Sequence, residues 1–286
     1  MIAIVIPTLN EPRLSETLAA LAAQTARDLV EEIIVVGVQQ NWSPPPGVQF
    51  VQTPQPVTAA EGRNLGAASA RAADIVFLDA DCIPQPDFVA CMAGALADGV
   101  VVGGAMILEQ KPYWLMCDNA LVFARSLSGA PCGERDYLPS FALGLRRALF
   151  ERVGGFDPAF FGRGGIAEDV DWSFRARELG ARLLFEPSAQ VAHRPARASA
   201  SAVWRHLRLF GRGWAQMAQT HPRLARSPIT RAPGWLRQMA ALAGPLLAAK
   251  DVLGVFAANP HLRAFWRAAP GMWWGKLAWY VGVANL

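Results

Sequence analysis

Residues 74–81 read Asp74-Ile75-Val76-Phe77-Leu78-Asp79-Ala80-Asp81, so that a short apolar run leads directly into two carboxylates. The apolar part predicts a strand buried on both faces of a sheet. In open α/β sheets, ligands bind at the carboxyl ends of the parallel strands, so Asp79 and Asp81 are expected at a ligand site. Carboxylates placed there can hold a divalent cation, with a pyrophosphate completing its shell. The alternative is a solvated turn with a helix cap.

The segments on either side alternate between predicted strands and predicted helices. Continuous apolar runs predict strands at 2–6, 32–36, 48–51, 100–108, 140–145 and 182–185. Helices are expected at 59–73, 87–96, 146–153 and 167–179, whereas residues 109–139 show no clear period. The βαβαβ order at the start of the chain predicts an α/β fold with a mostly parallel central sheet flanked by helices.

Composition narrows the class of protein. Of the 286 residues, 52% are hydrophobic and 17% charged, so the chain is not disordered by composition. The net charge, 27 − 23 = +4, is too small an excess to suggest a nucleic-acid binder. The four Cys form no CxxC pair and no zinc spacing, and are expected to be reduced thiols of a cytosolic protein. The first apolar run, at 2–6, is too short for a signal peptide.

A second acidic pair, Glu168-Asp169, begins a predicted helix after the Gly-rich loop at 162–165. Carboxylates at a helix N-terminus are favoured by the macrodipole, so the pair could serve only as caps. Alternatively, one of them could accept a proton from an acceptor hydroxyl as a general base. His193 follows the last predicted strand, as either a metal ligand or a loop histidine.

Five motifs occur in order along the chain: Val5-Ile6-Pro7-Thr8-Leu9-Asn10-Glu11, Arg63-Asn64-Leu65-Gly66, Phe77-Leu78-Asp79-Ala80-Asp81-Cys82-Ile83-Pro84, Gly154-Gly155-Phe156-Asp157 and Glu168-Asp169-Val170-Asp171-Trp172-Ser173-Phe174-Arg175. Each is weak alone. In this order and spacing they resemble the motifs of family 2 glycosyltransferases with the GT-A fold, over residues 1–195.

The resemblance implies an inverting transfer of a sugar from a nucleotide-sugar donor, with a divalent metal, Mn²⁺ or Mg²⁺, as cofactor. It makes Asp81 the principal metal ligand, with Asp79 nearer the ribose or the water shell of the metal, and His193 a further ligand. Asp169 becomes the general base, and Glu168 its orienting neighbour. The residues that it assigns to the donor pocket are Pro7, Thr8, Asn10, Glu11, Arg63, Asn64, Asp79, Ala80 and Asp81.

One position departs from the family pattern. The second strand of the family usually ends in an acidic pair followed by Gly-Ser, whereas here Gly37-Val38-Gln39-Gln40-Asn41 follows the strand. The acidic side chain typically accepts a hydrogen bond from the base of the donor. Gln39 or Asn41 could offer an amide oxygen instead, which leaves the identity of the base open.

Residues 198–286 lie outside the resemblance. Nine Arg and no acidic residue lie from Arg194 to Arg237, which suits anionic headgroups or a phosphate-bearing substrate, the alternative being a solvated face. Residues 201–217 predict an amphipathic helix at a membrane interface, or else an ordinary packing helix. Residues 235–258 could cross an apolar layer of ~30 Å, but Lys250-Asp251 favours a shallow or re-entrant placement. The Trp-rich end of the chain predicts a second interfacial segment.

The sequence thus predicts a GT-A catalytic domain at 1–197, with the donor side at 1–108 and the acceptor side at 109–197, and a helical membrane-associating region at 198–286. Expected partners are the donor, a hydroxyl acceptor on a lipid-linked sugar, glycan or other molecule, and the cytoplasmic surface of the inner membrane, but no nucleic acid. Two alternatives stay open. A nucleotidyltransferase would normally carry a Gly-rich basic loop after the first strand, and residues 7–11 contain no Gly. The other is a catalytically inactive, membrane-bound nucleotide-sugar binder.

Overall fold

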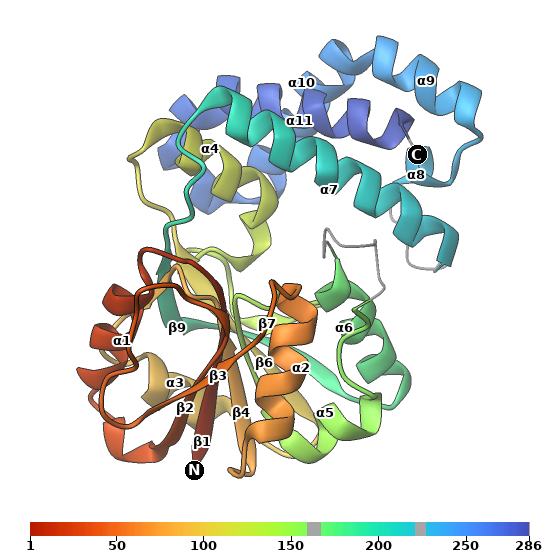
Figure 1. The fold of residues 1–286 in the computed structure, drawn as a ribbon. Coiled ribbons are helices and arrows are strands. Elements are labelled where there is room, and N and C mark those ends of the chain that lie inside the picture. The colour runs from red at the N-terminus through yellow and green to blue at the C-terminus, as the bar shows by residue number, and fades with distance from the viewer. Residues whose placement is uncertain (159–166, 221–226, 286) are drawn as a thin grey trace. The chain divides into compact units, whose positions relative to one another are not determined.

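The computed structural model describes residues 1–158, 167–220 and 227–285, and its contacts divide the chain into two units (Figure 1). The first comprises Met1–Ile107 and Pro131–Arg194, and the second comprises Leu108–Ala130 and Pro195–Leu286. The change at 194–195 lies close to the predicted boundary at 197. The segment 109–130, assigned from the sequence to the acceptor side of the catalytic domain, instead groups with the C-terminal unit.

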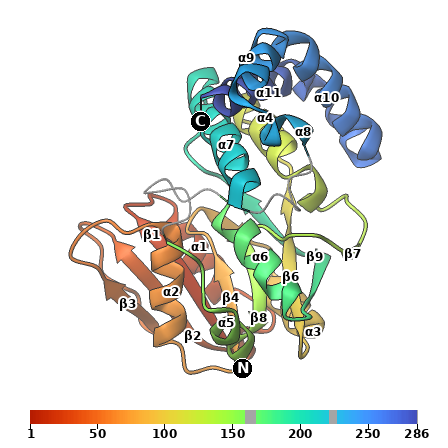
Figure 2. The same cartoon turned by 90° about the vertical axis from the view of Figure 1, so that its right-hand side faces the viewer.

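The first unit is a sheet with helices on both faces. Its strands are β1 (Ile2–Leu9), β2 (Val30–Val38), β3 (Val48–Gln52), β4 (Asp74–Leu78), β5 (Cys82–Pro84), β6 (Val100–Ile107), β7 (Gly133–Glu134), β8 (Ala142–Arg146) and β9 (Arg182–His193). Its helices are α1 (Leu14–Ala22), η1 (Arg27–Leu29), α2 (Ala59–Ser69), α3 (Phe88–Ala95), α5 (Arg147–Val153) and α6 (Glu168–Glu178). Helices α2, α5 and α6 lie over one face of the sheet, and α1 and α3 lie over the other (Figure 2).

The strand order is β3-β2-β1-β4-β8-β6-β9-β5, with β7 paired to β9. Strand β1 is parallel to both its neighbours, β2 and β4, and β3 continues the parallel part beyond β2. Strand β8 is antiparallel to β4 and to β6, whereas β6 and β9 are parallel. The α/β fold is therefore confirmed. The predicted parallel order holds for β1 to β4, and the other half of the sheet is mixed.

The sequence of β1 explains its central position. The side chains of residues 2–6 are at most 2% exposed, because β1 has a strand on each side and helices over both faces. Full burial of an Ile or Val side chain contributes about 1.5–3 kcal/mol, so this run is a strong determinant of the fold. Because β1, β2 and β4 run in the same direction, their carboxyl ends meet at one edge of the sheet, where ligands bind in open α/β folds.

The second unit is helical. It contains α4 (Tyr113–Val122), η2 (Ala124–Ser126), α7 (Ala200–Thr220), α8 (Pro228–Arg231), α9 (Gly234–Leu242), α10 (Gly244–Ala258), η4 (Pro260–Ala268) and α11 (Ala269–Ala284). Helix α11 packs against α4, α7, α9 and α10. A Cβ on Gly211 would collide with the carbonyl oxygen of Trp279, which shows that the backbones of α7 and α11 are in direct contact. Helix α11 is thus the core helix of this unit.

A buried carboxylate ties α4 to the C-terminal part of the second unit. Asp118 of α4 is fully buried and accepts a hydrogen bond from Arg197 Nε at 2.8 Å. Its other oxygen lies 2.7 Å from Nδ1 of His206 on α7. Helix α4 also packs against α7, α11 and η4, so residues 108–130 group with the C-terminal unit and not with the sheet.

Within the described residues, no single helix is both long and apolar enough to cross a membrane. Helices α9 and α10 together reach the required length and hydropathy, but they meet at a bend of 81°.

Candidate active site

A cleft of about 390 Å³ lies at the carboxyl ends of β1, β2 and β4. Most of the residues predicted to bind the donor are in its lining: Pro7, Thr8, Glu11, Arg63, Asp79, Ala80 and Asp81. The cleft is completed by Val36 at the end of β2 and by residues 57–59, which lead into α2. The structure therefore brings residues from three separate sequence motifs to one edge of the sheet.

Gln39 and Asn10, also assigned to the donor, connect the two loops that follow β1 and β2. Thr8 Oγ1 donates to Gln39 Oε1 at 2.9 Å, and Gln39 Nε2 donates to the carbonyl oxygen of Glu11 at 3.0 Å. Asn10 is left-handed, with φ 50°, and its Oδ1 accepts from the backbone N–H of Gln40 at 2.8 Å. The amide of Gln39 is thus used to hold the pocket wall, and its contact with a donor base stays a prediction.

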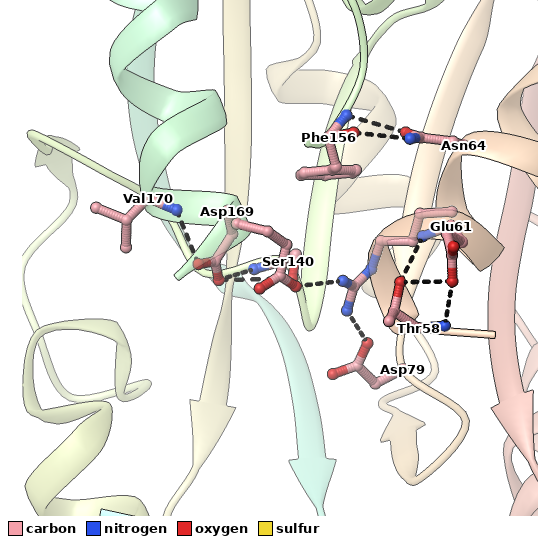
Figure 3. A network of polar contacts seen from close by, with 10 residues as sticks. Thr58, Glu61, Asn64, Asp79, Ser140, Phe156, Asp169 and Val170 are labelled. Atoms are coloured by element: carbon pink, nitrogen blue, oxygen red, sulfur yellow. Dashed lines mark hydrogen bonds and ion pairs between the residues drawn. The ribbon is translucent and has the colours of Figure 1, made fainter. Parts of the chain in front are cut away.

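Arg63 lies in the second turn of α2, a helix whose start is fixed by a capping box between Thr58 and Glu61. Its side chain is 3% exposed. The guanidinium donates to Asp79 Oδ1 at 2.6 Å and to Glu168 Oε1 at 2.9 Å (Figure 3). One buried cation therefore joins the carboxylate at the end of β4 to the acidic pair of α6.

Asn64, the next residue of α2, is absent from the lining of the cleft. Its Nδ2 donates to the carbonyl oxygen of Phe156 at 2.8 Å, and its Oδ1 accepts from the Phe156 N–H at 2.9 Å (Figure 3). Gly155 has φ 72°, and a Cβ there would lie 2.9 Å from Asn64 Oδ1, so this close approach requires glycine. Asn64 thereby fixes the motif at 154–157. The Gly-rich loop at 162–165 lies outside the described residues.

Helix α6 begins with Glu168 and Asp169, directly after Ala167 in the left-handed conformation. Burial, and then the charge of Asp169, raise the pKa of Glu168 to about 7. Asp169 Oδ1 accepts from the Val170 N–H at 2.8 Å and Oδ2 from the Ser140 N–H at 3.0 Å (Figure 3). Burial also raises the pKa of Asp169 above its ordinary value. Oriented carboxyl groups with raised pKa values are suited to accept a proton.

Asp81, Cys82 and His193 form a cluster of possible metal ligands. One oxygen, sulfur or nitrogen atom of each lies within 4.8 Å of the others, and His193 Nε2 is 3.6 Å from Asp81 Oδ1. The antiparallel pairing of β5 with β9 sets Cys82 opposite His193. Two ligands bound at about 2.0–2.3 Å to a tetrahedral ion lie roughly 3.3–3.8 Å apart, so the 3.6 Å between His193 Nε2 and Asp81 Oδ1 fits a single metal.

The structure thus brings Asp81 and His193 together, as the resemblance implied. Asp79 is outside this cluster and bonds to Arg63 instead. Cys82 was not predicted as a ligand, because the four cysteines form no CxxC pair and no zinc spacing along the chain. The sequence feature that could have indicated Cys82 as a ligand is its position directly after Asp81, at the start of the short strand β5.

Similarity to known proteins defines the family to which the chain belongs. Residues 3–154 match the model of the family described as Glycosyl transferase family 2. Because this match covers more than half of the 286 residues, the chain belongs to glycosyltransferase family 2, and the resemblance found in the sequence is confirmed.

A pre-mycofactocin glycosyltransferase of Mycobacterium tuberculosis, in strains CDC 1551 / Oshkosh and ATCC 25618 / H37Rv alike, is 29% identical over 157 residues. The match covers 51% of this chain and 32% of that protein, so the chain spans about a third of the length of this relative.

Two solved structures show the GT-A fold. The mannosyltransferase PcManGT from Pyrobaculum calidifontis, in complex with GDP-Man and Mn²⁺, is 19% identical with a TM-score of 0.63, covering 99% of this chain and 85% of that one. GalNAc-T7 with UDP, GalNAc and Mn²⁺ is 18% identical with a TM-score of 0.53, covering 74% of this chain and 47% of that one.

Proposed function

We propose that the chain transfers a hexosyl group, with inversion, from a nucleotide diphosphate sugar to a hydroxyl of an acceptor. The observation that carries the proposal is the arrangement of the cleft. Asp81 in the lining of the cleft forms a possible metal site with His193, and Arg63 joins Asp79 of the same lining to Glu168, the buried neighbour of Asp169. The nucleotides and Mn²⁺ in the two similar structures support a diphosphate leaving group and a divalent metal, Mn²⁺ or Mg²⁺.

In this proposal, each group has a distinct task. Asp81, His193 and Cys82 would hold the metal, whose positive charge would offset the charge on the departing diphosphate. Asp169 accepts the proton of the acceptor hydroxyl while that oxygen bonds to the anomeric carbon from the face opposite the diphosphate. The backbone hydrogen bonds from Ser140 and Val170 orient the Asp169 carboxylate, so it needs no reorientation to accept the proton.

The test measures the melting temperature with UDP, GDP, ADP and CDP, each with and without Mn²⁺, for the wild type and Asp81→Ala. A ligand that binds only the folded state raises the melting temperature. We expect one nucleotide to stabilise the wild type only with metal, and Asp81→Ala to lose that response. Absence of any shift at millimolar nucleotide would refute the donor site.

Turnover then separates the alternatives. Asp169→Asn is expected to keep the nucleotide response and lose transfer from the matching nucleotide sugar. Nucleotide binding by the wild type with no transfer or hydrolysis of any nucleotide sugar would support the inactive binder. Formation of nucleotide sugar and pyrophosphate from a nucleoside triphosphate would support the nucleotidyltransferase. A lipid-linked acceptor at the cytoplasmic surface of the inner membrane is part of our proposal, supported by the basic second unit.

A further inference from the structure

Two helices that the sequence assigned to a membrane interface have their apolar faces covered by protein. Val203 and Leu207 of α7 are at most 2% exposed and pack with Ala278 of α11. Farther along α7, Phe210 and Trp214 pack against a buried cluster that includes Trp279 and Tyr280. Helix α7 is therefore a packing helix, which was the alternative explanation of its pattern, and α11 is a core helix.

The exposed apolar surface of the second unit lies instead on α9, α10 and η4, residues 234–268, which we call the α9–α10 elbow. Six large apolar side chains there are each at least 57% exposed: Trp235, Met239, Leu242, Leu246, Leu253 and Trp266. Single exposed leucines are normal on a protein surface, whereas such a concentration marks an interaction site.

Helix α10 shows why these leucines point outward. Gly244, Ala248 and Val252, four residues apart, form its buried stripe. Leu246 and Leu253, seven residues apart, lie on another side of the helix and are 79% and 70% exposed. An ordinary surface helix places its large apolar residues inward and polar residues outward. The reversal indicates that something apolar covers the outer side of α10.

The dimensions of the elbow favour insertion into one leaflet. At a rise of ~1.5 Å per residue, the 9 residues of α9 and the 15 residues of α10 are each shorter than the ~30 Å apolar core of a bilayer. The bend of 81° prevents them from forming one straight span. Helices of this kind can lie in the boundary between headgroups and acyl chains, about 5–10 Å deep.

The excess of positive charge in the elbow indicates an anionic partner. Five basic residues lie in the elbow or just before it along the chain: Arg231, Arg237, Lys250, Arg263 and Arg267. Four of them are exposed, and Arg237 is half-buried. Between residues 227 and 268 the sequence has one acidic residue, Asp251, which lies 3.2 Å from Lys276 Nζ and accepts a hydrogen bond from Tyr280 Oη at 2.9 Å. This surface complements anionic headgroups, whereas a second copy would bring like charges together.

We propose that the α9–α10 elbow binds the surface of an anionic lipid bilayer, with its leucines in the acyl boundary and its basic side chains at the headgroups. This contact deepens the membrane surface named in the proposed function, and because it rests on residues of the second unit alone, vesicle binding can fail while sugar transfer is kept. It keeps the membrane contact predicted for residues 235–258 and removes the contacts predicted for α7 and α11, whose apolar faces are covered by protein.

The first test is co-sedimentation of the full chain with vesicles of phosphatidylcholine alone or mixed equally with phosphatidylglycerol. We expect binding to the mixed vesicles, and at least about tenfold weaker binding for Leu246→Glu/Leu253→Glu, because two apolar side chains no longer leave water. The matched control is Leu65→Glu/Leu179→Glu, which alters two exposed leucines of the first unit and is expected to bind like the wild type.

Equal binding by the two double variants, or no binding of the wild type to mixed vesicles, would overturn the proposal. So would a wild-type dimer in sedimentation equilibrium that Leu246→Glu/Leu253→Glu dissociates, because the leucines would then face a second copy.

A second test measures depth and changes a single leucine of the elbow. An environment-sensitive fluorophore is attached at Leu246→Cys, or at Leu179→Cys as control, in a chain in which the partly or fully exposed Cys91 and Cys132 are serine. Mixed vesicles should shift the emission at position 246 to the blue, and lipids with quenchers on the acyl chains should quench it. Position 179 should show neither change. Equal quenching at both positions, or none at 246, contradicts insertion of the elbow.

Discussion

The free energy of unfolding of the wild type should fall as the pH rises, because buried Glu168 must ionise, and Glu168→Gln should not show this fall. Burial beside Asp169 raises the pKa of Glu168 from 4.5 to about 7 in the folded protein. Between these pH values the folded state holds a proton on Glu168 that the unfolded state has released. The contribution of Glu168 to the free energy of unfolding is therefore fully present below pH 4.5 and is lost as the pH rises to 7. At about 1.4 kcal/mol per pKa unit, the loss amounts to about 3 kcal/mol. Glutamine resembles the protonated acid and does not titrate.

The free energy of urea unfolding, measured from about pH 4 to about pH 9, tests this reasoning. Relative to their difference at the acid end, Glu168→Gln should become more stable than the wild type by about 3 kcal/mol at neutral pH and above. Glu178→Gln, an exposed acid on the same helix, should follow the wild type. If the curves of the wild type and Glu168→Gln run parallel across this range, Glu168 does not carry the raised pKa and the argument fails.

Three further changes test other parts of the site. Arg63→Met leaves two buried carboxylates without their shared cation and should destabilise the protein by about 3–5 kcal/mol, seen in the urea midpoint; a loss no greater than that of the exposed control Arg152→Met would contradict the buried bridge. Asp169→Asn removes the proposed proton acceptor and should lower kcat by about 10²–10⁴, with the nucleotide-induced melting shift kept; an unchanged kcat would assign the base elsewhere. Cys82→Ser should weaken Zn²⁺ binding at least about tenfold and Mn²⁺ binding far less, because sulfur favours the softer ion; an equal effect of Cys117→Ser in metal competition would exclude Cys82 as a ligand.

The sequence predicted the first half of the sheet well because burial on both faces leaves a clear signal. Strands β1, β2 and β4 are continuous apolar runs, and the structure places all of them in the core. A strand was also predicted at 140–145, close to β8 at Ala142–Arg146, but an apolar run does not reveal the direction or the neighbours of a strand. Its antiparallel insertion between β4 and β6 depends on contacts that no local pattern records.

Helix α4 shows the opposite case, in which burial removed the signal. Residues 115–120 are all buried, including Asp118. A helix covered on every side has no polar face, so the period of 3.6 residues that identifies a surface helix is absent. Residues 109–139 accordingly show no clear period in the sequence.

The candidate site was located from the sequence, but its internal connections were not. The spacing of Asp79 and Asp81 predicted an acidic edge without showing that the two carboxylates have different partners. Asp79 bonds to Arg63, 16 residues away, and Arg63 in turn bonds to Glu168, 105 residues away. Asp81 lies near His193 only because β5 pairs with β9. Pairings at such separations are set by the tertiary fold, so motif spacing alone cannot supply them.

The second unit shows what amphipathic patterns do and do not determine. The stripe on α7 correctly predicted a helix with an apolar partner, and in the structure that partner is α11. On α10, the buried stripe of Gly244, Ala248 and Val252 satisfies packing within the unit, yet Leu246 and Leu253 stay outside. Hydropathy alone ranks both helices as candidates for a membrane. The distinction comes from which apolar side chains the protein itself leaves uncovered, and this makes the outer side of α10, rather than α7, the surface that needs a second partner.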